Sequence, residues 1–521
     1  MKLHRIIAGF LAALCLPLSV AFADDQELGS ISFPNSGAAD AQSAFLTGVK
    51  ALHSFQFDEA RFAFEEAQKI DSSFALAYWG QAMSDNHPLW AQQDMDAATA
   101  ALKRLAPTFK GRLAKAETEK EKAFLTAIET LYYSADDKLK RDFAYSEQMA
   151  RMHERWPEDD EVSVFYALSL LGTVRPGDQG YRRQVLAASI AQSVYAKNEQ
   201  HPGGAHFIIH SFDDPDHAIL ALPAAKVYAE IAPASAHALH MPSHIFLQLW
   251  RWQGVVDSNI DAYSAALATN KKFGLAEGRE DFHTLSWRAY AYLMLGNFDE
   301  AANDLALAKD TMARNPDSAR VHGGYLNILG RHVLETEQWA DFKLEPIESV
   351  EGSHANWVSV VGMSAAHRGD SDLASKAINR LVMLADAANA DGNMYGAKQI
   401  AILQKETMAV LSLANGDADA AVAHAREAAQ MEMRDMQAPS GPPIPMKPAA
   451  ELYADILLAA DRPVEAVAAY EQSLQWVPLR TPSIAGLARA AASSGDAATA
   501  EEMLSKLKAM PGISKARTVI R

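Results

Sequence analysis

Cysteine is almost absent from this sequence of 521 residues, and its absence excludes several kinds of chemistry. The single cysteine, Cys15, lies in an apolar run near the N-terminus. The rest of the chain can therefore form no disulfide, and it offers neither a thiolate nucleophile nor a thiolate metal ligand. The fold must depend on a hydrophobic core, which a chain of this length with 49% hydrophobic residues can readily bury.

Positive charge is also scarce. The formal net charge is −17 at pH 7, and it becomes −19 when Lys2 and Arg5 are removed with the N-terminal segment. An acidic surface repels the phosphates of nucleic acids and of anionic lipids, so we expect no nucleic-acid partner. No stretch after residue 23 is long and apolar enough to cross a bilayer, so we also expect no membrane span in the mature chain.

The N-terminus has the pattern of a cleavable secretory signal peptide. Basic residues precede an apolar run at 6–20, and Ala21-Phe22-Ala23 supplies the small residues that a signal peptidase recognises. We predict that residues 1–23 are removed by cleavage after Ala23. The mature protein is then expected to be periplasmic or secreted.

Strand-like alternation of apolar and polar residues is nearly absent, whereas apolar residues recur at helical spacing along most of the chain. The predicted helices come in pairs joined by a recurring signal. A Gly or Asn ends one helix in a left-handed turn, an Asp caps the next helix, and a small Ala allows close approach. The signal occurs at residues 57–60, 297–301, 369–374, 416–421 and 495–500. This pattern predicts an all-α fold.

The interval between Ala466 and Ala500 is 34 residues, which is the period of the tetratricopeptide repeat. The segments 45–80, 285–315 and 452–478 resemble this repeat, with small and aromatic residues at its packing positions. Because other intervals are longer, the resemblance implies an irregular α-solenoid, a superhelix of helix-turn-helix repeats. Such arrays hold an unidentified protein or small-molecule ligand in a concave groove, and the fold alone does not name it.

Composition divides the chain further. Residues 24–40 are small and polar and are predicted to form a flexible lead-in. The prolines of residues 437–448 exclude a regular helix, so this segment is either a linker between repeats or an ordered loop across the concave face. We predict N-terminal repeats at residues 41–200, followed by a histidine-rich helical segment at 201–283 and central repeats at 284–436. The proline-rich loop at 437–448 and C-terminal repeats at 449–521 complete the chain.

Histidine is concentrated in one part of the chain, because seven of the 17 histidines lie between residues 201 and 244. Pro202 suits the first position of a helix. That helix would carry His206 and His210 on one face, four residues apart, and Asp213 would continue the face.

A second histidine string follows a predicted helix. His237, His240 and His244 would share one face of a continuous helix. Pro242 interrupts this string, so either the helix kinks there or a new helix begins at the proline. Both alternatives keep the three imidazoles within a turn or two of one another.

Neutral imidazole binds Zn, Cu, Fe and Ni, and imidazoles four residues apart can present two nitrogens to one ion. We therefore predict a transition-metal site (Zn, Cu or Fe) in which Asp213 or Asp214 completes the shell or orients an imidazole. The predicted metal ligands are His206, His210, His237, His240, His244, Asp213 and His217. The alternative is that these histidines only pack and cap helices, since no named metalloenzyme motif is present.

Two further strings are candidates for the edge of the same site. Asn86-His87-Pro88-Leu89-Trp90 is either a plain turn or a pocket rim. The string Glu280-Asp281-Phe282-His283 opens a helix, and it either caps that helix or places a carboxylate and an imidazole inward. The candidate pocket residues are His201, Asn86, His87, Trp90, Asp214 and His283.

The strings at 86–90, 206–217 and 237–244 resemble those of a family of bacterial exported proteins that contain tetratricopeptide repeats. The resemblance implies that the three strings occur together on a helical-repeat fold. It implies neither an activity nor a substrate.

Three functions remain open from the sequence. The first is a metal-dependent protein, either a hydrolase that uses an activated water or an oxidoreductase that uses a redox metal. The second is a scaffold for a partner protein, with structural histidines. The third is sugar binding by some of the nine tryptophans, but Trp79, Trp287, Trp339 and Trp476 occupy repeat packing positions, which favours a core role.

Overall fold

The computed structural model describes residues 27–175, 178, 180–344 and 354–514. The predicted signal peptide and its cleavage position after Ala23 lie outside the described residues. Within the described ranges, no helix is both long enough and apolar enough to span a membrane.

The described residues form a long series of helices and one very short sheet. The first group is η1 (Ala39–Ala41), α1 (Gln42–His53), α2 (Phe57–Ile70), α3 (Ala75–Ser84), β1 (Asn86–His87), η2 (Pro88–Trp90), β2 (Gln92–Gln93), α4 (Met95–Leu105), α5 (Phe109–Leu113), α6 (Glu119–Tyr133), α7 (Lys138–Arg155), α8 (Asp160–Leu171) and α9 (Arg182–Lys197). The second is α10 (Pro202–Ser211), α11 (Ala218–Ile231), α12 (Ala236–His240), α13 (Pro242–Gln248), α14 (Trp252–Phe273), α15 (Glu280–Leu295), α16 (Phe298–Arg314) and α17 (Ala319–Thr336). The third is α18 (His354–His367), α19 (Ser371–Ala390), α20 (Met394–Ala414), α21 (Ala418–Asp435), α22 (Ala449–Ala459), α23 (Pro463–Trp476), α24 (Thr481–Ser494) and α25 (Ala497–Ala509).

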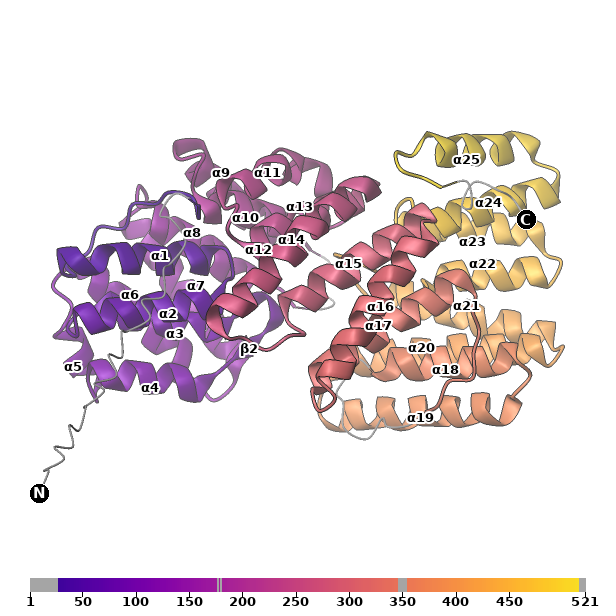
Figure 1. Cartoon of the computed structure of the whole chain (residues 1–521), viewed down its shortest axis with the longest axis horizontal. Coiled ribbons are helices and arrows are strands. Elements are labelled where there is room, and N and C mark those ends of the chain that lie inside the picture. The colour runs from indigo at the N-terminus through magenta and orange to yellow at the C-terminus, as the bar shows by residue number, and fades with distance from the viewer. Residues whose placement is uncertain (1–26, 176–177, 179, 345–353, 515–521) are drawn as a thin grey trace, which may run out of the picture.

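Helices that follow one another in the chain pack side by side along most of its length. Figure 1 shows α1–α8 at one end of the longest axis, α18–α25 at the other end, and α10–α17 between them. The strands β1 and β2 form a two-stranded antiparallel hairpin in which Asn86 pairs with Gln93. This arrangement confirms the prediction of an all-α, irregular solenoid built from helix pairs.

Small residues opposite aromatic rings explain why the helices approach closely. Phe64 on α2 packs between Gly48 and Gly80, where an added Cβ would lie 2.8 Å and 2.3 Å from its ring. The same device recurs near the C-terminus, where a Cβ on Gly486 would lie 2.3 Å from the Tyr470 ring. A larger side chain at any of these glycines would separate the helices, because packed cores do not absorb extra methyl groups without strain.

The Gly-Asp turn signal is correct at three of its five positions. Gly369, Gly416 and Gly495 adopt positive φ angles, and the aspartate after each one accepts a hydrogen bond from the first turn of the next helix. At the other two positions the prediction of an aspartate cap is wrong. Neither α2 nor α16 has a side-chain cap, and Asp58 instead pairs with Arg279.

The predicted flexible lead-in is wrong for residues 28–40. Leu28 and Phe33 are buried with 0% and 4% exposure. The Phe33 ring packs edge-on against Phe45 and Trp79, with centroids 5.4 Å and 5.9 Å apart. Two apolar side chains among small polar residues are enough to fix the segment on the first repeat, because each one removes a large apolar area from water.

The proline-rich segment 437–448 is an ordered loop that contacts other parts of the chain. Gln248 donates a hydrogen bond of 2.8 Å to the Pro439 carbonyl, and Arg331 donates one of 2.9 Å to the Pro443 carbonyl. Gly441 lies against Trp287, since a Cβ there would be 2.6 Å from the indole. The loop thus joins the C-terminal repeats to α13, α15 and α17.

Candidate metal centre

Four short helical segments carry the clustered histidines. The helix α10 begins at Pro202, as predicted, and presents His206 and His210 on one face. After α12, a new helix begins at Pro242, which decides between the two alternatives for that proline. The start of α15 then brings His283 and Glu280 to the same region.

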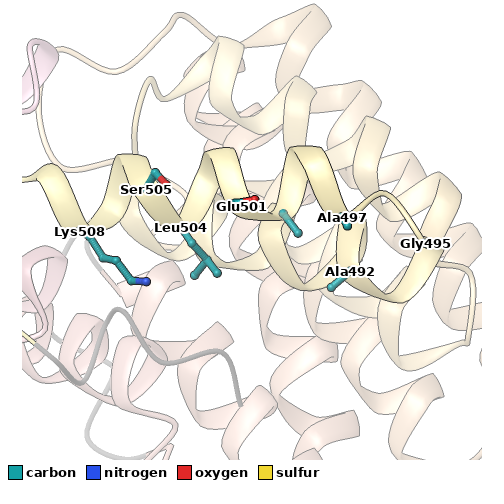
Figure 2. Close-up of a pocket in the computed structure, with 8 residues that line it drawn as sticks. Ala492, Gly495, Ala497, Glu501, Leu504, Ser505 and Lys508 are labelled. Carbon is teal, nitrogen blue, oxygen red and sulfur yellow. The ribbon is translucent and has the colours of Figure 1, made fainter.

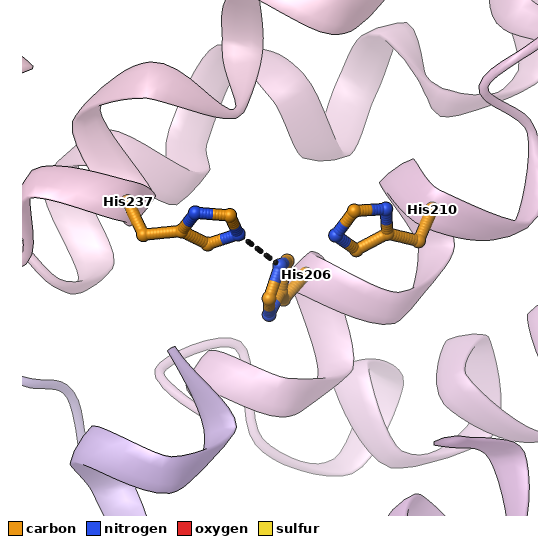
Figure 3. A group of neighbouring side chains, drawn as sticks. All are labelled: His206, His210 and His237. Atoms are coloured by element: carbon orange, nitrogen blue, oxygen red, sulfur yellow. Dashed lines mark hydrogen bonds between the residues drawn. The ribbon is translucent and has the colours of Figure 1, made fainter. Parts of the chain in front are cut away.

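Three imidazoles from α10 and α12 form what we call the first trio: His206, His210 and His237. Their ring nitrogens lie within 4.8 Å of one another. The Nε2 atoms of His206 and His237 are 3.1 Å apart, and the His206 and His210 rings have centroids 4.7 Å apart. Figure 3 shows a ring nitrogen of His210 facing this pair, and its Nε2 atom is buried without a hydrogen-bond partner.

Three more imidazoles form the second trio: His240, His244 and His283. Their ring nitrogens also lie within 4.8 Å of one another. The Nε2 atom of His240 is 3.1 Å from that of His244 and 2.9 Å from that of His283. The sequence analysis placed His283 only at a pocket edge, whereas the structure places it inside the cluster.

In the first trio, two Nδ1 atoms are held by acceptors outside the trio. His206 Nδ1 donates to the backbone carbonyl of His53 at 2.6 Å. His237 Nδ1 donates to Glu280 at 3.3 Å. Burial alone would raise the pKa of Glu280, but the hydrogen bond and charge of His237, with His283 nearby, hold the pKa at about 2. Glu280 is therefore an ionised acceptor at neutral pH.

The second trio is held in the same way. His240 Nδ1 donates to Asn259 Oδ1 at 2.7 Å, while the amide of Asn259 donates to the Val255 carbonyl. His244 Nδ1 donates to Asp213 Oδ2 at 2.6 Å. Asp213 therefore orients an imidazole from outside the trio, which is one of the two roles predicted for it.

In a neutral imidazole whose Nδ1 carries the proton, Nε2 has a lone pair and no hydrogen atom. In each trio two such Nε2 atoms face each other at 3.1 Å. Facing lone pairs repel unless a cation lies between them. Histidines that bind metals usually donate their other ring N–H to a carboxylate or a carbonyl, and the four bonds above have that pattern.

Protons are poor candidates for the cation. Burial, followed by the charge of neighbouring imidazoles, places the pKa of His206, His210 and His240 well below the ordinary 6.5. Burial also lowers the pKa of His283 to about 4, with Glu280 opposing the shift. At neutral pH these imidazoles are uncharged, which is the form that binds metals.

The spacing of the nitrogens fits a transition metal. Nitrogen ligands at about 2.0–2.1 Å from a tetrahedral ion are about 3.3 Å from one another. The measured Nε2 separations of 2.9 and 3.1 Å are close to this value. The three ring nitrogens of each trio lie within 4.8 Å of one another. A modest rotation of the third ring would therefore bring its nitrogen to bonding distance from the same ion.

The two trios are neighbours and not separate sites. The rings of His210 and His244 have centroids 5.9 Å apart, and those of His237 and His240 are 6.3 Å apart. Each trio can hold one ion, so the six imidazoles can hold two ions side by side.

Aromatic rings enclose the trios. Phe55 contacts three rings of this cluster, with centroid distances of 4.5 Å to His206 and 5.3 Å to His237. Its backbone has φ +53°, an unfavourable conformation for a bulky residue, and such conformations concentrate at functional sites. On the other side Trp287 lies 4.3 Å from the His244 ring. Trp287 also belongs to the buried hydrophobic core, as the sequence predicts.

A cavity of about 820 Å³ reaches the trios from the solvent. Its lining includes one histidine from each trio, His237 and His283, as well as Glu280. His87 and Trp90 line its outer part. The string at 86–90 is therefore a pocket rim, and Glu280 and His283 point inward, which decides both alternatives left open by the sequence.

Three predicted residues lie away from the two trios and the 820 Å³ cavity. His217 is not in either trio; it pairs with Asp214 at 2.8 Å and packs against Tyr181. Asp214 accepts the backbone N–H of His217 and so shapes the turn before α11. Asn86 is buried and bonded to Gln93, and the 820 Å³ cavity does not include it. The sequence could not separate these residues from the site, because turn formation uses the same polar side chains.

His201, predicted to lie at a pocket, belongs to a third and fully buried group with His53 and Glu161. His53 Nε2 is 2.8 Å from Glu161, and His201 Nε2 is 3.3 Å from it. Burial alone would raise the pKa of Glu161, but the two histidines hold it at about 2. This group fixes the end of α1, whose His53 carbonyl orients His206.

Sequence reasoning missed His53, Asn259 and Phe55. His53 acts through its backbone carbonyl, and a carbonyl leaves no signal in side-chain identity. Asn259 lies within α14 with no neighbouring polar motif. A bulky residue just after the predicted helix end was the only signal for Phe55.

A second hollow of about 440 Å³ lies along α25, far along the chain from the histidines. Figure 2 shows its lining, which includes Glu501, Leu504 and Lys508. It contains no histidine and no cluster of titratable groups, so it is not a candidate for metal chemistry.

Comparison with known proteins finds only distant similarity to solved structures. Neither a protein-family model nor a curated protein sequence matches the chain. The structure of human IFIT1 with m7Gppp-AAAA is similar at 12% identity, covering 94% of this chain and 95% of that chain, with a TM-score of 0.31. Yeast Tom70 has 12% identity, 91% and 92% coverage and a TM-score of 0.28. The TPR domain of P58(IPK) has 14% identity, 88% and 99% coverage and a TM-score of 0.22. These are tetratricopeptide-repeat proteins, and the similarity implies nothing about a ligand.

Proposed function

We propose that the chain is an exported helical-repeat protein that binds two transition-metal ions, one in each histidine trio. The observation that supports this most is the convergence of Nε2 atoms whose rings are tethered through Nδ1. Imidazoles that only pack or cap helices have no need to face one another with unprotonated nitrogens. A cation in each trio would remove the repulsion between them.

The donor set narrows the choice of metal. Six imidazole nitrogens with no thiolate suit Zn, Cu or Fe, and they do not suit the oxygen-preferring ions Mg²⁺ and Ca²⁺. Asp213 and Glu280 add two carboxylates just outside the ligands, where they partly balance the charge of two dications. The proposed site thus needs no further anionic ligand from the protein.

The cavity suggests an enzyme that acts on a small substrate. A metal bound by three protein ligands keeps an open position, at which it can activate water or bind a reactant. In this chain His237 and His283 face the cavity, while Phe55 and Trp287 shield the other rings from solvent. The protein residues would thereby hold the ligand nitrogens in place and limit the entry of water.

Metal stoichiometry tests the proposal directly. Protein without a histidine tag is reconstituted with Zn²⁺, Cu²⁺ or Fe²⁺, desalted, and examined by native mass spectrometry and elemental analysis. We expect two ions per chain for at least one metal. His210→Ala should remove the ion of the first trio and His283→Ala the ion of the second, so each variant keeps one.

The matched control is His424→Ala, which removes a histidine outside the clusters and should keep both ions. Less than half an ion per chain with every metal would contradict the proposal. In that case the helical-repeat scaffold, with structural histidines, would be the remaining function.

A further inference from the structure

We infer that the cavity above the two trios binds a small hydroxylated aromatic molecule, of the phenol class. The inference extends the proposed function by naming the chemistry of the substrate. It is carried by two features of the cavity wall, namely a continuous series of aromatic rings and a set of buried polar side chains without hydrogen-bond partners.

The aromatic series runs from the rim of the cavity to the first trio. Trp90 lies at the rim with 49% of its surface exposed. His87 stacks on Phe57 at a centroid distance of 4.0 Å, and Phe57 stacks on Phe55 at 5.4 Å. Phe55 then contacts His206 at 4.5 Å. A planar ring can therefore move inward from Trp90 and stay in contact with aromatic surface throughout.

The exposure of Trp90 has no structural explanation in the repeat packing. The residue belongs to η2, which lies between the two strands of the β1–β2 hairpin. Its indole meets the edges of Phe55 and Phe57, at 5.6 Å and 6.5 Å. Aromatic pairs prefer offset-stacked or edge-to-face arrangements, so the open indole face offers a docking surface for a further ring.

Three polar side chains in the cavity wall have unmet hydrogen-bonding capacity. Gln56 is 9% exposed, and neither its amide oxygen nor its amide nitrogen has a partner. Asp85 Oδ2 and Asn270 Nδ2 are likewise buried without partners. Buried polar atoms are nearly always hydrogen-bonded in folded proteins, so these atoms suggest a ligand with a hydroxyl or similar group.

The charges of the wall do not favour a highly charged ligand. Arg279 pairs with Asp58, and Lys272 pairs with Glu59 at 3.6 Å. The rest of the wall is acidic, with Asp85, Asp94 and Glu280 against Arg61 and Arg320, so it disfavours an anionic ligand. A neutral ring with a hydroxyl group satisfies both the aromatic series and the unpartnered polar atoms, which an aliphatic acid would not.

Isothermal titration calorimetry with three matched probes tests the inference. Full-length protein, with its metal content measured beforehand, is titrated with 4-methylphenol, 4-methylcyclohexanol and toluene. We expect 4-methylphenol to bind at least about tenfold more tightly than the other two, because only it has both the ring and a donor for the unpartnered atoms. Equal affinity for 4-methylphenol and 4-methylcyclohexanol would overturn the inference.

Variants locate the binding. Trp90→Ala should weaken 4-methylphenol binding by about tenfold, whereas Trp90→Phe should keep most of it. Gln56→Leu should remove the preference for 4-methylphenol over toluene. Trp250→Ala, a change at another exposed tryptophan outside the cavity, is the control and should have no effect. Unchanged binding in Trp90→Ala and in Gln56→Leu would also overturn the inference.

The metal measurement separates this inference from the proposed function. A protein with two ions per chain that does not distinguish the probes retains the proposed function and loses the inference. A protein that selects 4-methylphenol and holds no metal retains the inference as a binding site and loses the metal centre.

Discussion

The chain contains two large buried polar clusters, and they differ in what they need from outside. In the C-terminal half, Arg480 is 1% exposed and donates to Glu451 at 2.7 Å and to Tyr290 at 3.1 Å. Arg480 also pairs with Glu335, and Lys447 pairs with Asp455 at 2.5 Å. Each of these five charges has an opposite charge beside it.

The histidine cluster in the other half lacks this internal balance. Four of its Nδ1 atoms have hydrogen-bond partners outside the trios, whereas its Nε2 atoms face one another or have no partner. A cluster of paired opposite charges stabilises the fold by itself. A cluster of imidazole nitrogens that all present lone pairs needs a bound cation to be stable. Burial of polar groups alone therefore does not identify a functional site. The chemical type of the buried atoms that lack a hydrogen-bond partner does.

The largest effect on stability is expected at the C-terminal cluster. Arg480→Met leaves Glu451 and Glu335 buried without their cation, which should cost about 3–5 kcal/mol of unfolding free energy. Urea unfolding monitored by circular dichroism measures this loss, and metal content should not change. Arg462→Met, at an arginine on the surface paired with Glu465, is the control and should have a far smaller effect, because exposed ion pairs contribute little. Equal losses in the two variants would contradict the contrast.

Metal removal should lower the stability of the folded chain by a comparable amount. Each ion at a free concentration 100-fold above its dissociation constant stabilises the folded chain by about 2.7 kcal/mol. Treatment with a chelator should therefore lower the unfolding midpoint of the loaded wild-type protein. The double variant His210→Ala with His283→Ala should show no response to the chelator. A chelator response of equal size in that variant would mean that the metal acts elsewhere.

The carboxylate behind the second trio should tune affinity without being a ligand. Asp213→Ala removes the acceptor of the His244 Nδ1 proton, so we expect metal affinity to fall by about 10–100-fold. Competition with a chromophoric chelator measures the change. Asp216→Ala, at an exposed aspartate three residues away, should leave affinity unchanged. An unaltered metal affinity in Asp213→Ala would show that the hydrogen bond between Asp213 and His244 does not contribute to metal binding.

The smallest effect concerns pH and the C-terminal half. Burial, opposed by hydrogen bonds from Ala449 and Ala450, raises the pKa of Glu432 from 4.5 to about 8. Between these values the folded chain holds a proton that the unfolded chain releases, so stability falls as pH rises, by about 1.4 kcal/mol per pH unit. Glu432→Gln should reduce this slope between pH 6 and 8, as measured by unfolding at several pH values. An identical slope in the variant would contradict the assignment.

The fold was predictable because its signals are local and repeated. Gly48 and Gly80 around Phe64, and the Gly-Asp turn at Gly416, specify helix pairs from short stretches of sequence. The lead-in was not predictable from composition, because two apolar residues, Leu28 and Phe33, outweigh their polar neighbours once a complementary surface exists.

The site was predictable in part, for a related reason. Helical spacing places His206 beside His210, but only the tertiary fold brings α10, α12 and α15 together and divides the histidines into two trios. His217 has the same sequence signal as the true members, yet Asp214 fixes it in a turn. The His53 carbonyl that orients His206 has no sequence signal at all.

The most direct measurement of the central claim is an anomalous difference map from crystals of the metal-loaded protein, with data collected at the absorption edge of the bound metal. The account predicts two peaks, each about 2.0–2.1 Å from ring nitrogens of one trio: His206, His210 and His237 for the first, and His240, His244 and His283 for the second. A map with no peak among these six imidazoles, from crystals shown to contain the metal, would contradict it.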